Sequence, residues 1–426
     1  MTDITQYDGV RLITTYWSSI KPDKGYDLIF VGDVHADMNQ FIAPLVLSGL
    51  ITIQDEVKEI KTNKTIIYVP KYTIDSRSKV KIVYLGDIAD EWIFSRSITY
   101  MLLDLLKNAG GNVFYIYGNH DLAIIGRYHL FKAKQLNFAL DIPALWQTLK
   151  KELNNVKNLK IYKTVAALDG DPSKGYNYIY NYIEPLFDNL YEIFDSGLGN
   201  VSLAIEINNK PYMLSHTTWT TQAIQQLISN DENVSNKPDA RPSDTNPEQL
   251  KPVKRQTLNI DKDKAYIQSL LSAVNSGSSN QLEYKQISDS INKIFHQKSR
   301  LYISKNLLTY TRITKNIFLN HIIGHSSGAE FRDQGVNTSL STYYNERLEK
   351  LKPTYFNGRT VYYFDFGCSA GYDHDEIGRP DFVYTSSNGL YVTNLPAFSF
   401  ILSNGKDSLL VMKDKTPRTS NKIIFQ

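Results

Sequence analysis

Three short polar clusters carry residue types that can hold metal ions and move protons. They read Gly32-Asp33-Val34-His35, Gly86-Asp87-Ile88-Ala89-Asp90 and Gly118-Asn119-His120-Asp121. Each cluster follows a short apolar run that breaks at the glycine, where a buried strand is expected to end. Two further histidines, His216 and His325, stand at the ends of later apolar runs.

Carboxylate, imidazole and amide donors in these positions favour a metal centre. The donors are Asp33, Asp87, His35, His216, His325 and Asn119. Oxygen and nitrogen ligands of this kind suit manganese, iron, zinc or magnesium better than soft metals. The set is large enough for two neighbouring cations bridged by one carboxylate. The single cysteine, Cys368, cannot build a thiolate cage, so any metal must use nitrogen and oxygen ligands.

The elements that must position these clusters can be read from hydrophobic patterning. Apolar runs at 27–31, 81–85 and 113–117 predict three buried strands. Between the second and third, residues 97–111 place apolar side chains at helical spacing and end in Gly110-Gly111. This strand–helix–strand unit predicts parallel pairing in an α/β core, with the three clusters converging at the carboxyl ends of the strands.

A second set of strands and several inserted segments complete the predicted organisation. The later strands are expected at 201–207, 211–215, 316–324 and 359–367. The sequence predicts one catalytic domain over residues 1–426. Its insertions are a surface hairpin at 51–80, a helical segment at 122–195, and a segment at 229–309 in which a polar, proline-bearing loop (229–262) precedes helices.

Composition narrows the class of protein. The chain has 426 residues and a formal net charge of +3, which argues against a nucleic-acid partner. No apolar run is long enough to predict a membrane span. The N-terminus is acidic and polar, unlike a classical secretory signal. With one cysteine, the chain suits a reducing compartment, and we expect it in the cytoplasm or delivered to a host cytosol without a classical signal peptide.

The ordered motifs GD-x-H, GD-x-x-D, GNH-D, H and GH resemble those of the calcineurin-like metallophosphoesterase superfamily, especially its phosphoprotein phosphatase branch. They span residues 33 to 325. Each motif alone is weak, but the ordered set, at the ends of predicted strands, is specific. The resemblance implies a four-layer αββα sandwich and two divalent metal ions, with manganese first and iron, zinc or magnesium as alternatives.

The resemblance also implies a role for each residue. Asp33 and His35 would bind the first metal, and Asp87 would bridge both. Asn119, His216 and His325 would complete the second. His120 would be the general acid on the leaving oxygen, oriented by Asp90, while a hydroxide bridging the two metals attacks phosphorus in line.

The motifs differ from the common family pattern at three positions, and the change that bears on the substrate is the missing arginine of the second motif. The first motif usually ends in glycine, where this chain has Ala36. The usual phosphate-clamping arginine after Asp90 is replaced by Glu91, so Arg127 and Arg332 become the candidate substrate-binding arginines. The last motif lacks a second histidine and has Ser327 there, which resembles the phosphoprotein phosphatases.

The leading hypothesis is therefore a phosphatase acting on phosphoproteins, at Ser/Thr and also Tyr. The alternatives are a small-molecule phosphohydrolase of the same fold, acting on a nucleotide or dinucleotide polyphosphate, and an inactive phosphate-binding module. Histidines without a motif position are expected to be structural or to lie at the surface. One of them, His321, is expected four residues before His325 on the same strand, so the two side chains should point to the same face, which allows His321 a supporting role beside the site.

Overall fold

A computed structural model gives the fold. It describes residues 6–22, 28–36, 38–61, 66–89, 94–122, 125, 184–207, 210–228, 260–276, 283–299, 317–325, 354–356, 358–363, 383–386, 389–392, 400–403, 409–412 and 422–425. Three of the predicted site residues, Asp90, Arg127 and Arg332, lie outside these ranges. So do most of the predicted 122–195 insertion and most of the predicted loop at 229–262.

A six-stranded sheet contains the three early strands. Its order is β15 (Lys422–Phe425), β14 (Leu409–Met412), β13 (Phe400–Ser403), β1 (Leu28–Val31), β4 (Lys81–Tyr84) and β5 (Val113–Tyr115). β1, β4 and β5 are parallel neighbours, as the sequence predicts. The expected helix is α3 (Ser95–Asn108), which connects β4 to β5. The strands β13 to β15 add to β1 in antiparallel order.

A second, five-stranded sheet contains the later strands. Its order is β6 (Ser202–Ile207), β7 (Lys210–Ser215), β8 (His321–Ile323), β10 (Arg359–Tyr363) and β9 (Thr354–Phe356). β7, β8 and β10 run parallel. β8 is shorter than the predicted run at 316–324. Just before it, Asn320 uses its side chain to accept a hydrogen bond from the Thr360 amide and to donate one to the Pro211 carbonyl.

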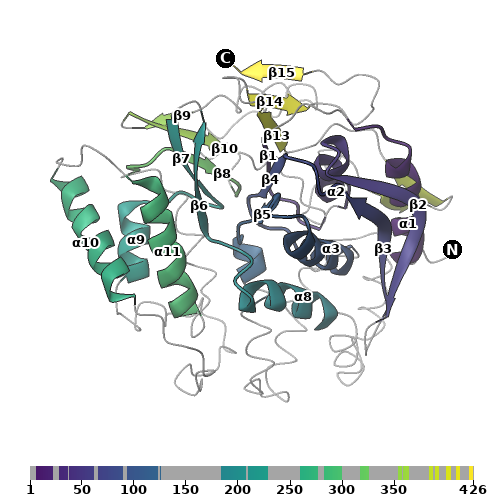
Figure 1. Ribbon diagram of the computed structural model, residues 1–426, viewed down its shortest axis with the longest axis horizontal. Helices are drawn as coiled ribbons and strands as arrows, with labels where there is room; N and C mark the ends of the chain where they lie inside the picture. The colour runs from purple at the N-terminus through teal and green to yellow at the C-terminus, as the bar shows by residue number, and fades with distance from the viewer. Residues whose placement is uncertain are drawn as a thin grey trace.

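The two sheets pack face to face through an apolar layer. It is formed by side chains that alternate toward the other sheet along each strand, namely Phe30, Val83, Leu85 and Ile116 from the first sheet and Tyr212, Leu214 and Ile322 from the second. The opposite faces are covered by helices. In Figure 1, α9 (Thr221–Ile228), α10 (Asp261–Asn275) and α11 (Tyr284–Ser299) lie beyond the second sheet. The chain is therefore layered, with one sheet against the other at its centre.

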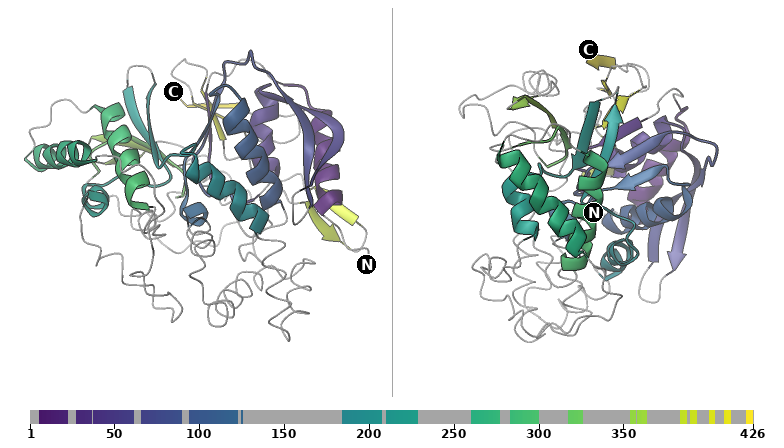
Figure 2. Two further views of the ribbon diagram at one scale, coloured as in Figure 1. Left: turned by 60° about the horizontal axis from the view of Figure 1, so that its bottom comes forward. Right: turned by 60° about the vertical axis from the view of Figure 1, so that its left-hand side comes forward.

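The far side of the first sheet is covered by α2 (Met38–Leu47), α3 and α8 (Glu184–Asp195), and α1 (Gln6–Ser18) lies farther out, beside α2 (Figure 2, left). The Tyr84 ring stacks on Phe41 of α2, and its hydroxyl donates to the Phe41 carbonyl. Lys107 of α3 pairs with Glu192 of α8. The buried Tyr84–Phe41 contact holds α2, the helix that follows the first polar cluster, against the sheet.

Residues within the 51–80 segment form a two-stranded hairpin, β2 (Ile51–Lys61) and β3 (Ile66–Ile74). One face is buried through Ile53, Ile67 and Val69 and packs beside α1, while charged side chains on the other face remain exposed. Among the helices that the structure describes, none combines the length and the apolar character that a membrane crossing requires. A further strand pair, β11 (Val383–Ser386) and β12 (Gly389–Val392), stands apart from both main sheets.

Candidate metal centre

The loops after β1 and β4 are joined by backbone hydrogen bonds. The amides of Val34 and His35 donate to the Asp87 carbonyl at 3.1 and 2.7 Å, and the Ala36 amide donates to the Ile88 carbonyl at 3.1 Å. His35, Ala36 and Asp87 have positive φ values of 45°, 61° and 45°. Such values are uncommon outside glycine and tend to gather at functional sites. They also explain why glycine suits the position of Ala36, since glycine reaches this region without steric cost.

Asp87 lies at the centre of the candidate site. Its Oδ1 accepts a hydrogen bond from the His120 amide at 2.8 Å. Its Oδ2 is buried and receives no hydrogen bond from any residue that the structure describes. Four imidazole nitrogens surround that oxygen, His216 Nε2 at 3.4 Å, His35 Nε2 at 3.9 Å, and His120 Nε2 and His325 Nδ1 at 4.0 Å. A buried carboxylate oxygen without a donor is the environment that a cation would satisfy.

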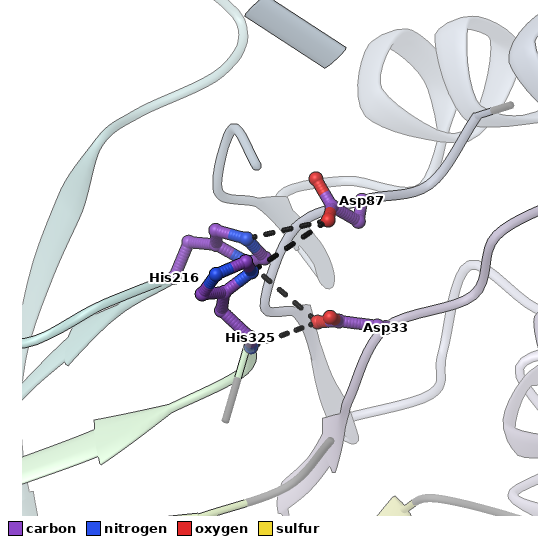
Figure 3. Close-up of side chains that lie close together, drawn as sticks. All are labelled: Asp33, Asp87, His216 and His325. Atoms are coloured by element: carbon purple, nitrogen blue, oxygen red, sulfur yellow. Dashed lines mark hydrogen bonds and ion pairs between the residues drawn. The ribbon is translucent and has the colours of Figure 1, made fainter. Parts of the chain in front are cut away.

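Two groups of side chains could each hold a metal ion, and Asp87 belongs to both. The first consists of Asp33, Asp87, His216 and His325, and the second of His35, Asp87 and His120. Within each group, one ligand atom per residue lies within 4.8 Å of the others. Figure 3 shows the aspartates of the first group, which follow strands of one sheet, facing the histidines, which follow strands of the other. The residues present therefore fit a pair of divalent cations that share one carboxylate.

The histidine ligands are oriented by groups around them. His216 Nδ1 lies 2.9 Å from the Leu85 carbonyl, which accepts its proton, so Nε2 can serve as a ligand. That Nε2 lies 2.9 Å from Asn119 Oδ1 and 3.4 Å from Asp87 Oδ2. The His325 amide donates to Asp33 Oδ1 at 3.0 Å. The sequence-predicted donors Asp33, His35, Asp87, Asn119, His216 and His325 are thus brought together.

Glycines before three of the donors allow the loops to approach closely. A Cβ on Gly324 would lie 2.6 Å from Asp33 Oδ1, and one on Gly118 would collide with the Asp87 side chain and amide. Gly86 has a φ of 112°, and a Cβ there would collide with the His216 ring. These three glycines are therefore required by space, and Gly86 is required also by its backbone conformation.

Charge interactions inside the centre favour an ionised Asp87. Burial acts to raise the pKa of this carboxyl, but its electrostatic interactions with the surrounding imidazoles of His216, His120 and His35 hold the pKa well below its usual range. The site thus keeps a negative charge at its centre, which is the charge that two cations require.

His120 is the most exposed histidine of the centre, with 25% of its side chain accessible. Its ring meets the His35 ring edge-on, with centroids 5.1 Å apart. His216, in contrast, is fully buried. His120 is therefore the imidazole best placed to meet a substrate at the mouth of the site.

Asp121 is a supporting residue that sequence reasoning missed. Its buried carboxylate accepts hydrogen bonds from the amides of Ile88 at 3.0 Å, Ala89 at 3.1 Å and Gly118 at 2.9 Å. Burial, together with the nearby charge of Asp87, raises its pKa to about 6. It joins the second polar cluster to the third. The sequence did give one indication of this role, because Asp121 is the last residue of the third motif and has no ligand role there.

We expect Asp121→Asn to lower the free energy of unfolding by about 1–3 kcal/mol, because the amide group turns two N–H donors toward backbone donors. Urea denaturation of the metal-free protein measures this change. Asp289→Asn on α11 is the control, since its partner Lys285 is exposed and such pairs contribute little. Equal midpoints for wild type and Asp121→Asn would show that the carboxylate does not join the loops.

His321 belongs to neither group of candidate ligands. The expectation that it shares a strand face with His325 is wrong, because β8 ends at Ile323 and His325 lies in the loop beyond. His321 is buried, and its ring bonds to the backbone of Leu319 and Trp219. Burial lowers its pKa to about 4. His321 therefore bonds to backbone groups and is not one of the candidate metal ligands.

The lowered pKa of His321 predicts that the free energy of unfolding depends on pH. Its folded pKa lies below the unfolded value of about 6.5, so its contribution is complete above that pH and is lost as the pH falls through about 4. The change amounts to about 3 kcal/mol. We expect metal-free wild type to lose more stability between pH 6.5 and 4 than His321→Gln, measured by urea denaturation at each pH. Parallel pH profiles would contradict the buried neutral state.

Comparison with protein families identifies the chain. The family profile of the calcineurin-like phosphoesterases matches residues 24–238, just over half of the chain. The match includes Asp33, Asp87, Asn119 and His216. Searches of curated proteins and of solved structures gave no match. The α/β architecture and the Asp/His groups suited to metal agree with this match. The chain therefore belongs to the calcineurin-like phosphoesterase family.

Proposed function

We propose that this protein is a dinuclear metal-dependent phosphatase that hydrolyses phosphomonoesters, with phosphoproteins as its substrates. One observation carries the proposal. The buried Oδ2 of Asp87 has no hydrogen-bond donor among the described residues, and four imidazole nitrogens lie within 4.0 Å of it. This arrangement suits an oxygen shared by two cations in an enzyme that transfers a phosphoryl group to water.

The proposed ligand assignment uses the position of each oxygen. Asp33 Oδ2 lies 3.7 Å from His35 Nε2, which supports Asp33 and His35 as ligands of the first metal, with Asp87. Asn119 and His216, in hydrogen-bond contact with each other, would hold the second metal with Asp87 and His325. Asp33 Oδ1 also lies 3.6 Å from His216 Nδ1, so its two oxygens face the two halves of the centre. Manganese is the proposed metal, with iron, zinc and magnesium as alternatives.

When bound by Asp33, His35, Asp87, Asn119, His216 and His325, two divalent cations would supply positive charge for the phosphoryl oxygens and would lower the pKa of a water molecule. His120 has the exposed position that a general acid needs and would protonate the departing oxygen from its ring. The Asp87 carboxylate fixes the His120 backbone, which keeps the ring at the mouth of the site. Asp90 is the proposed partner that orients this imidazole. Arg127 and Arg332 remain the proposed phosphate-binding arginines.

The layered arrangement supports the four-layer αββα sandwich as the fold of a single catalytic domain. The helical and hairpin segments, 51–80, 122–195 and 229–309, are then insertions on this core. We propose that the segment after the third motif forms one wall of the substrate groove, because it departs from the candidate centre directly after Asp121.

Metal analysis and two substrate panels test the function. Purified protein should contain two divalent ions per chain and turn over p-nitrophenyl phosphate with Mn²⁺, and chelation should abolish turnover. A panel of phosphopeptides, covering Ser, Thr and Tyr, should give higher kcat/KM than nucleotides and dinucleotide polyphosphates. A preference for the nucleotide panel would favour the small-molecule phosphohydrolase. Metal binding without turnover on any substrate would favour the inactive phosphate-binding module.

A further inference from the structure

A buried histidine occupies the middle strand of the second sheet, away from the candidate ligands. His321 begins β8 and pairs in register with Met213 of β7 on one side and Val361 of β10 on the other. Its side chain is fully buried. A histidine in such a place is stable only if both ring nitrogens find partners.

Both nitrogens have backbone partners that define the state of the ring. The Nδ1–H donates to the Leu319 carbonyl at 3.0 Å, and Nε2 accepts from the Trp219 amide at 3.0 Å. The second bond requires a lone pair on Nε2, so the imidazole is neutral with its proton on Nδ1. The lowered pKa of His321, about 4 because of burial, agrees with that state at neutral pH.

The Trp219 amide matters because of the segment to which it belongs. Residues 216–220 connect β7 to α9, and the segment begins with the candidate ligand His216. All five residues are buried. Ser215 Oγ donates to the Thr217 carbonyl at 2.5 Å, and Thr220 forms a bridge with Ile317, in the segment before β8. His321 is thus a side-chain anchor for the segment, three residues after His216.

We propose that His321 is a positioning residue for the metal centre, which holds segment 216–220 through the Trp219 amide and so keeps His216 aimed at Asp87. This inference rests on one part of the proposed function, which is that the candidate centre binds metal ions. Among the described residues, His321 forms no hydrogen bond or ion pair with a candidate ligand, and it would act through the backbone that it anchors.

The Trp219 amide is buried, and among the contacts of the described residues His321 Nε2 is its acceptor. Without the imidazole, the Trp219 N–H must find another partner, which requires segment 216–220 to shift. His216 Nε2 lies 3.4 Å from Asp87 Oδ2, and a displacement of about 1 Å would spoil that approach. Outer residues that orient metal ligands typically change metal affinity about 10-fold to 100-fold when replaced.

A pair of variants separates anchoring from general packing, because each removes one of the two hydrogen bonds. His321→Asn keeps a donor near the Nδ1 position but is too short to accept from the Trp219 amide. His321→Gln places its oxygen near the Nε2 position and keeps that acceptor. Both substitutions remove the ring and leave a polar side chain of similar size. Melting temperatures of the metal-free forms report how far each variant is destabilised.

Isothermal titration calorimetry of the metal-free protein with Mn²⁺ gives, for each variant, the affinity of the candidate metal group that contains His216. We expect His321→Asn to weaken Mn²⁺ binding about 10-fold, and His321→Gln to bind within about 3-fold of wild type. His296→Asn is the control, since its ring bonds to the Gly199 carbonyl and packs on Tyr117 and Phe194. It should lower the melting temperature without weakening Mn²⁺ binding.

The other outcomes overturn the inference. Unchanged Mn²⁺ affinity in His321→Asn would show that the anchor does not act on the ligand. Equal losses in the Asn and Gln variants would show that the ring contributes by packing alone. If wild type itself bound no divalent metal, the proposed function would fail first. A wild type with two metals and an unaffected Asn variant would leave that function intact and remove only the role of His321.

Discussion

Asp87→Asn should abolish turnover and reduce metal occupancy from two ions toward none. Asp87 belongs to both candidate metal groups, so one substitution removes a ligand from each. An amide oxygen also brings no negative charge to offset two dications in a buried site. Metal content after gel filtration and turnover of p-nitrophenyl phosphate at saturating Mn²⁺ measure the two effects together.

The matched control is Asp263→Asn on α10, which removes a carboxylate whose partner is Lys293. It should retain both metals and full turnover. Circular dichroism of Asp87→Asn checks that the fold persists, so that loss of metal is not loss of structure. Full activity with two bound metals in Asp87→Asn would refute the bridging assignment.

His120→Asn should lower turnover by about 10²–10⁴ for substrates with poor leaving groups, while metal occupancy stays at the wild-type level. The reason is that a general acid acts on the departing oxygen. Phenyl phosphate, whose leaving group needs a proton, should therefore suffer much more than p-nitrophenyl phosphate, whose leaving group departs as a stable anion. Comparing kcat for the two esters in wild type and variant gives the result directly.

The alternative role for His120 is ligation, since it forms a group with His35 and Asp87. In that case the substitution should release metal to an extent comparable with Asp87→Asn, and both esters should slow equally. His296→Asn serves again as a control for replacing a histidine that lies outside the centre. The two readouts, occupancy and leaving-group dependence, thus decide between acid and ligand.

The sequence was sufficient to predict the elements that carry the site. The runs before Gly32, Gly86 and Gly118 are continuous apolar stretches that end in glycine, and they are the parallel strands β1, β4 and β5. Parallel strands present their carboxyl ends at one edge, so convergence of Asp33, Asp87 and Asn119 followed from topology. His216 and His325 could be placed because they too follow strands.

Other features depended on contacts between residues far apart in the chain, which local patterns do not reveal. The role of Asp121 arises from three backbone amides that come from two loops. The position of His321 relative to His325 depended on where β8 ends. Just before that strand, the Asn320 side chain forms hydrogen bonds with the backbone of Pro211 and Thr360. The pairing of β13 with β1 required knowledge of the whole sheet.

The position of β1 has a consequence for how the chain acquires its structure. This strand, which leads to Asp33, pairs with β4 on one side and with β13, from the C-terminal part of the chain, on the other. Its register joins Leu28 to Ser403, so closing the sheet requires a loop that contains nearly the whole sequence. Contacts of such high contact order form slowly. During synthesis, one edge of the strand that carries the first motif therefore stays without its native neighbour until residues 400–403 have left the ribosome.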